Sequence, residues 1–128
     1  MALKQIVLRL ARNENAPDGD DRQGYVLVAP LDPKGRIDLE SWRAHKEFCE
    51  VKRFHPDPDE AADGWLTHNG SHWRIRYDED REGPDESGYR LGDHSFRPGE
   101  YVTIASHGVT PLVYIVTDVL PFREADAA

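Results

Sequence analysis

Hydrophobic residues follow a two-residue period near the amino end of the chain and form a continuous run further on. Ile6, Leu8 and Leu10 are separated by single residues, which is the period of a strand with one face in a core. Residues 25–29 are all apolar, and this run is short enough for a strand that is buried on both faces. We therefore expect a first strand at residues 6–11 and a central strand at residues 25–29.

A change to helical spacing follows a turn at residues 32–35. Asp38 is well placed to accept the free backbone N–H groups at a helix start, which predicts one covering helix near residues 38–49. The side chains spaced three and four apart on this helix form one stripe that should pack on a sheet. They are Leu39, Trp42, His45 and Cys49.

The best local signal is a pair of strand-like runs in residues 65–77, joined by an Asn-Gly pair of the kind that forms tight hairpin turns. A two-residue turn at this pair would place Leu66 opposite Trp73 and Trp65 opposite Arg74. Leu66 and Trp73 would then face a core, together with Ile75 and Tyr77. Trp65 would lie on the other face of the hairpin.

A second hairpin is predicted at the carboxyl end, from residues 101–104 and the β-branched run at 112–119. Together these elements predict a mainly β (α+β) fold with an antiparallel sheet that is strongly curled or closed into a small β-barrel. We expect one domain over residues 1–128, with a frayed tail at 124–128.

The formal charge of the chain is −8, from 16 Lys and Arg against 24 Asp and Glu. Such a field repels phosphate backbones and anionic lipids, so nucleic acid and membranes are unfavourable partners. Cys49 is the single cysteine, which excludes an intramolecular disulfide and a thiolate zinc cluster and fits a reducing, cytoplasmic location. We expect no metal and no cofactor.

Six histidines raise the question of metal binding or catalysis. The hairpin sends His68 and His72 to opposite sides of the sheet, so they should not share an ion. A site built from Asp93, His94 and His107 would support a small hydrolase or a metal-dependent enzyme, and this is the alternative reading of the function.

A binding role is the first hypothesis, because no complete catalytic motif is found. An exposed Trp65 beside Arg74 and Arg76 could hold an aromatic or anionic ligand by stacking and charge, and the protein would then recognise another protein or a small ligand. The segment from Tyr89 to Tyr101 is a second candidate surface. Nucleic-acid binding is a further alternative, which needs the arginines at positions 9, 12, 74 and 76 on one face.

One segment resembles part of a group of small bacterial proteins that have no assigned activity. It comprises Gly88, Tyr89, Arg90, Leu91, Gly92, Asp93, His94, Phe96, Pro98, Gly99, Glu100, Tyr101, Val102 and Ile104. The last third of the chain also resembles the entry to small β-barrels of the Src-homology or oligonucleotide-binding type. Because such barrels host unrelated functions, the resemblance implies an architecture and no activity.

Overall fold

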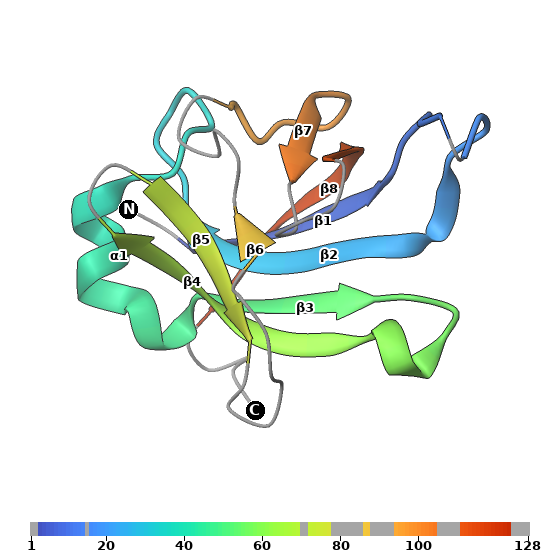
Figure 1. Ribbon diagram of the computed structural model, residues 1–128. Helices are drawn as coiled ribbons and strands as arrows, with labels where there is room; N and C mark the ends of the chain where they lie inside the picture. Colours follow the sequence, from blue (N-terminus) through green and yellow to red (C-terminus); the bar gives the residue numbers. More distant parts are fainter. Residues whose placement is uncertain are drawn as a thin grey trace.

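The computed structural model describes residues 3–14, 16–69, 72–77, 86–87, 94–104 and 111–123. It shows a strongly curled antiparallel sheet, a half-barrel, with one short helix at one end (Figure 1), which confirms the mainly β prediction. The strands are β1 (Leu3–Leu10), β2 (Asp20–Pro30), β3 (Glu50–Phe54), β4 (Ala62–Asn69), β5 (His72–Tyr77), β6 (Glu86–Ser87), β7 (Tyr101–Ile104) and β8 (Leu112–Pro121). The helices are α1 (Leu39–His45) and two single 3-10 turns, η1 (Lys46–Phe48) and η2 (Pro58–Glu60).

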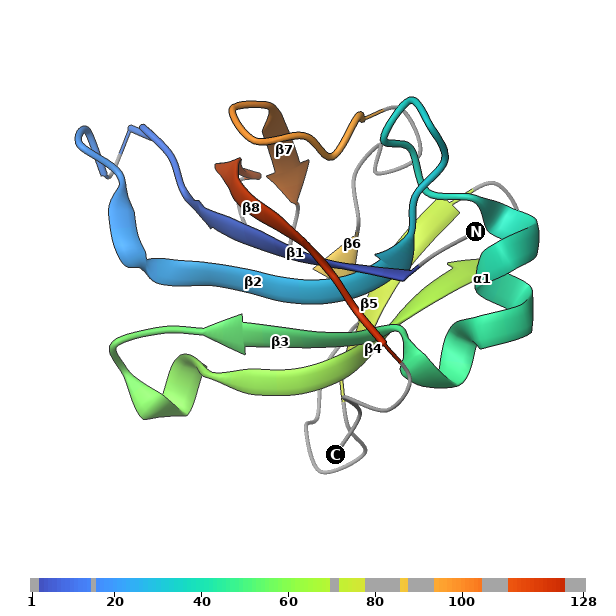
Figure 2. The same ribbon diagram turned by 180° about the vertical axis from the view of Figure 1, so that it is seen from behind.

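The strands lie in the order β6-β5-β4-β3-β2-β1-β8-β7, so β2 is central, as its apolar run predicts. Tyr25, Leu27, Val28 and Ala29 of β2 are all buried. The sheet curls until β4 and β5 lie in front of β1 and β2, with β8 passing behind (Figures 1 and 2). One continuous sheet therefore supplies both walls of the core.

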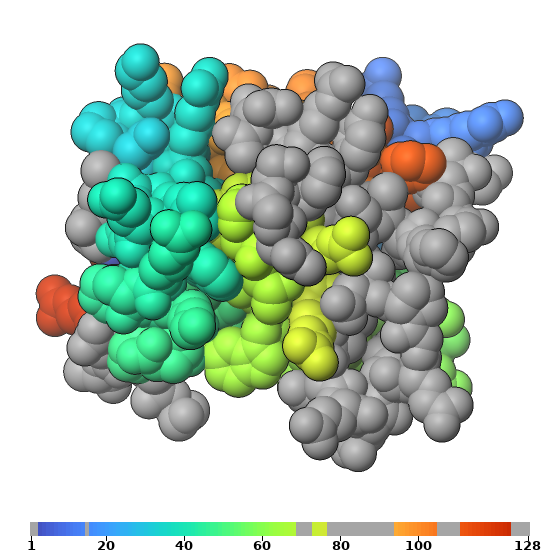
Figure 3. All heavy atoms as spheres, turned by 60° about the vertical axis from the view of Figure 1, so that its left-hand side comes forward, coloured from blue at the N-terminus to red at the C-terminus, as the bar shows by residue number. Residues whose placement is uncertain are grey.

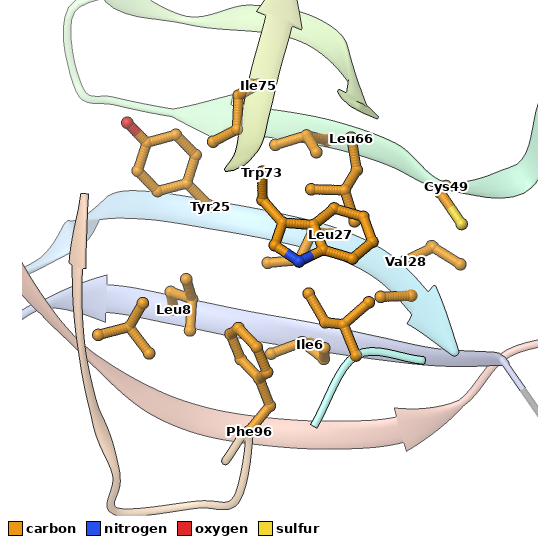
Figure 4. Close-up of a cluster of buried hydrophobic side chains, with 14 of the residues drawn as sticks. Ile6, Leu8, Tyr25, Leu27, Val28, Cys49, Leu66, Trp73, Ile75 and Phe96 are labelled. Carbon is orange, nitrogen blue, oxygen red and sulfur yellow. The ribbon is translucent and has the colours of Figure 1, made fainter. Parts of the chain in front are cut away.

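The core fills the concave side of this sheet. Trp73 and Ile75 of β5 point towards Ile6 and Leu8 of β1, and Phe96 enters from the opposite side (Figure 4). These five side chains are at most 6% exposed. Burying large side chains of this kind is the main source of stability in a small domain.

Helix α1 begins where the sequence predicts. The Asp38 carboxylate accepts a hydrogen bond from the Ser41 N–H at 2.9 Å, which satisfies one free donor of the first turn. The α-helix ends at His45, earlier than the predicted residue 49, and a 3-10 turn continues to Phe48. This tighter turn brings the chain directly into β3 at Glu50, and Cys49 at the junction is fully buried.

Trp42 joins the helix to the β4–β5 hairpin. Its indole N–H donates to the buried carbonyl oxygen of Leu66 at 3.0 Å, and its ring meets the ring of Trp73 edge to face at 5.4 Å between centroids. The predicted stripe thus packs on the sheet through one aromatic side chain that also satisfies a backbone acceptor.

The hairpin is present, but its predicted register is wrong. Leu66 pairs with Ile75, and Trp65 pairs with Arg76, because the strands separate after Asn69 and rejoin at His72, one residue later than the Asn-Gly turn requires. Each residue of β4 therefore pairs with a residue of β5 two positions further along the chain than predicted. Because side chains alternate with a period of two, every side chain stays on its predicted face of the sheet. Leu66, Trp73 and Ile75 are therefore buried, as predicted.

The closing hairpin of β7 and β8 is confirmed, with Tyr101 opposite Ile115. Gly99 precedes it with a φ of 95°, a conformation that suits glycine, and its N–H donates to the Val116 carbonyl at 2.8 Å. β8 then pairs with β1 along most of its length, which fixes the carboxyl-terminal hairpin to the centre of the sheet.

Replacing Trp42 tests the link between helix and hairpin. Trp42→Phe keeps an aromatic ring but removes the donor to the buried Leu66 carbonyl, so we expect a loss of about 1–3 kcal/mol in the free energy of unfolding. Urea denaturation followed by far-UV circular dichroism measures it. Trp65→Phe, at an exposed position, is the matched control and should change stability by no more than about 0.5 kcal/mol. Equal effects of the two substitutions would contradict this role of Trp42.

Candidate functional site

The convex side of β4 and β5 carries the surface that we call the outer β4–β5 face: Trp65, Thr67, Arg74 and Arg76. Trp65 is 41% exposed, and both arginines are exposed as well. Side chains of β4 and β5 reach the surface beside α1 (Figure 3). Trp65 thus lies on the face opposite the buried Trp73, as the alternation along the hairpin predicts.

The register decides which residues neighbour the indole. Trp65 lies directly opposite Arg76 on β5 and opposite Glu50 on β3, whereas Arg74 lies opposite Thr67. The predicted Trp65–Arg74 pair is therefore wrong, and Arg76 takes its place. Neighbouring strands are about 4.8 Å apart, so Glu50, Trp65 and Arg76 form a row across three strands.

Charges on this face are unevenly compensated. Lys52 lies opposite Asp63 on the neighbouring strand, so these two charges face each other. Arg74 and Arg76 have no ion-pair partner among the residues that the structure describes. Two guanidinium groups are thus available beside an exposed indole, with the Glu50 carboxylate on the far side of the ring.

The side chains of this face are suited to binding a ligand. An indole face gives stacking area, and guanidinium groups give forked hydrogen-bond donors to carboxylate or phosphate oxygens. A planar ligand with a negative charge would contact Trp65 and Arg76 together. Glu50 would disfavour a second negative charge next to the ring.

A cluster of three aromatic rings supports this face from inside. The His68 ring lies 4.7 Å from Trp73 and 6.2 Å from Trp42, measured between centroids. Alternation along β4 places His68 on the same inward side as Leu66, but the sequence does not predict that its ring packs against two tryptophan rings. Packing of these rings holds β4 and β5 in a fixed position beneath Trp65.

The surroundings of Cys49 disfavour the thiolate form of its side chain. The side chain has no exposed surface, and burial, with the nearby Glu47 charge as a smaller cause, raises the pKa of its thiol to about 12. The thiol also points to the His45 carbonyl oxygen, at 3.5 Å. A nucleophilic role needs a thiolate, so the geometry agrees with the core position predicted for Cys49.

Thiol chemistry tests this burial. We expect Cys49 to react with 5,5′-dithiobis(2-nitrobenzoate) far more slowly at pH 8 in the native protein than in urea. Because only the unfolded chain ionises this thiol between its ordinary pKa and about 12, rising pH over that interval should also lower the free energy of unfolding. Absorbance at about 412 nm follows the released thiolate. Equal native and denatured rates would show that Cys49 is accessible.

The set predicted for catalysis, Asp93, His94 and His107, falls mostly outside the described residues. Asp93 and His107 lie outside the described residues, as does Tyr89, and His94 is half-buried. Tyr101 is 59% exposed on β7, but β3, β2, β1 and β8 lie between β7 and the strand of Trp65. Tyr101 and Trp65 therefore belong to separate parts of the sheet surface.

The four arginines considered for nucleic-acid binding do not share one patch. Arg9 lies on β1, where its guanidinium donates to Thr117 at 2.6 Å and contacts Asp118 at 3.3 Å. Three strands separate β1 from the strand of Arg74 and Arg76. Arg12 directly follows β1 and is exposed there.

Within the described ranges, no group of three or more His, Cys, Asp or Glu side chains is arranged to hold a metal ion. None of the helices in those ranges has the length and apolar character needed to cross a bilayer.

The class defined by this geometry is a mainly β half-barrel with a short helix at one end and an aromatic, cationic outer face. Comparisons of the chain with protein-family models, with curated proteins and with solved structures found no match. Any statement about function therefore depends on the site itself.

Proposed function

We propose that this protein is a non-enzymatic binding domain that recognises a protein or a small ligand through the outer β4–β5 face. The observation that carries the proposal is the exposed Trp65 next to Arg76, with Arg74 on the same face. An exposed large aromatic side chain costs solvation free energy unless a partner covers it, and exposed tryptophan and arginine are the residues most enriched at binding hot spots.

The partner group best suited to this face is a planar aromatic ring with one negative charge. Stacking on Trp65 would supply the contact area, and the charge would pair with the Arg76 guanidinium. Such a group can belong to a small molecule or to a side chain of another protein. The fully reduced cysteine, enclosed in the core, supports a reducing compartment such as the cytoplasm as the place of action.

The test uses 2-naphthoate as the probe, with 2-naphthamide as the uncharged match and cyclohexanecarboxylate as the non-aromatic match. We expect naphthoate to bind best, and Trp65→Ala to weaken its binding at least about tenfold, the effect of losing one stacking contact. Arg76→Ala should weaken it several-fold and remove most of the salt dependence. Isothermal titration calorimetry gives the dissociation constants.

Arg12→Ala is the matched control, because Arg12 is exposed but lies outside this face. It should leave naphthoate binding unchanged. Equal binding by the wild type and by Trp65→Ala would reject the outer β4–β5 face as the site. Equal binding of naphthoate and naphthamide would reject the role of charge.

Removing the charge of Glu50, which lies next to Trp65, should strengthen naphthoate binding, the opposite of the effect expected for Arg76→Ala. The carboxylate lies across from Trp65 on β3, so Glu50→Gln removes a repulsive charge and should tighten naphthoate binding by about two- to fivefold. The gain should shrink at high salt and vanish for naphthamide. Weaker naphthoate binding by Glu50→Gln would contradict the arrangement of charges derived above.

A further inference from the structure

Two loops far apart in the sequence lie side by side at one end of the half-barrel: residues 31–37, between β2 and α1, and residues 94–100, before β7 (Figures 1 and 2). Three hydrogen bonds join them. The Phe96 N–H donates to the Gly35 carbonyl at 2.7 Å, the Ser95 hydroxyl to the Lys34 carbonyl at 2.8 Å, and the Arg97 guanidinium to the Pro33 carbonyl at 3.3 Å. We call this unit the loop pair.

The loop pair is anchored to the core and has little freedom to rearrange. Phe96 is 1% exposed and fills the core between the two walls of the sheet (Figure 4). The first loop closes on itself, because the Asp32 N–H donates to the Arg36 carbonyl at 2.8 Å and the Gly35 N–H to the Asp32 carbonyl at 2.9 Å. Side chains on this unit are therefore presented from a fixed backbone.

Three exposed cations gather on the loop pair: Lys34, Arg36 and Arg97. Arg97 runs across Gly35, where an added Cβ would lie 3.3 Å from its Cγ and 3.4 Å from its Nε. Gly35 also has a φ of 82°, a conformation that L side chains rarely adopt. The Arg97 side chain thus lies over Gly35, the residue that separates Lys34 from Arg36.

The acidic residues of the loop pair offset these three charges in part and leave a net charge of +1 with histidine neutral. The loop pair has two acidic residues against these three cations: the exposed Glu100 and, in the first loop, Asp32. Its carboxylate is engaged with the backbone, accepting the N–H groups of Lys34 at 2.8 Å and Arg36 at 3.0 Å. None of the three cations has an ion-pair partner in the part of the chain that the structure describes. This local positive charge stands out in a chain with a net charge of −8.

From this geometry we propose that the loop pair is a binding site for a small ligand with clustered phosphate groups. A single carboxylate brings one negative charge to three cations, whereas adjacent phosphates bring several negative charges and enough oxygens for two guanidinium forks and an ammonium group. The site is separate from the outer β4–β5 face and uses none of its residues.

Inorganic tripolyphosphate is the probe, titrated into the full chain and followed by calorimetry. The wild type should bind it, with affinity falling as salt rises. Lys34→Ala and Arg36→Ala should each weaken binding several-fold, and the double variant at least about tenfold, because each removes an exposed charge without touching the hydrogen bonds between the loops. Arg97→Lys keeps the charge and should show an intermediate loss.

Arg12→Ala, at an exposed position outside both the loop pair and the outer β4–β5 face, is the control and should bind tripolyphosphate like the wild type. The Lys34→Ala/Arg36→Ala variant should still bind 2-naphthoate like the wild type. This separates failure of the loop-pair site from failure of the proposed function. Absence of tripolyphosphate binding by the wild type, or equal binding by the Lys34→Ala/Arg36→Ala variant, would overturn the site. Tighter binding of hexathymidylate than of tripolyphosphate at equal phosphate concentration would overturn its assignment to a small ligand.

Discussion

The packing of the β4–β5 hairpin over β1 and β2 is the contact on which the rest of the structure depends. Leu66, Trp73 and Ile75 form the upper layer, and they can reach the lower layer only because the intervening strands curl the sheet back on itself. Twisted strands curl readily, and closing the curl removes apolar area from water on both walls at once. Trp42 then holds the hairpin at the helix end through its bond to the Leu66 carbonyl.

The outer surfaces follow from this packing. Once Leu66 and Trp73 face inward, alternation along the strands forces Trp65 and Arg76 to face outward, and the rings beneath keep their backbone in place. Phe96 has the same effect at the other end, because burying it brings Arg97 against Gly35. Both proposed binding surfaces therefore rest on side chains that point into one core, and their positions are set before any ligand arrives.

Local chemistry explains where prediction from the sequence succeeded and where it failed. Asp38 could be placed as a helix cap from its own position, since a cap needs only the next three residues. The predicted pairing of the hairpin strands begins one residue too early, because Asn69-Gly70 and the adjacent Gly70-Ser71 are both residue pairs that suit a two-residue turn. The pairing of Trp65 with Arg76 depended on that choice, whereas its outward direction did not.

By itself the sequence determined most of the strands, the start of the helix, the burial of Cys49 and the inward or outward direction of Trp65, Leu66, Trp73 and Ile75, because these follow from periods of two and 3.6 residues along a short stretch. Only the tertiary structure decided the row of Glu50, Trp65 and Arg76 and the position of Arg97 over Gly35, between Lys34 and Arg36. The Ser95 and Lys34 partners are 61 residues apart, and no local pattern records a contact between segments that only the curl of the sheet brings together.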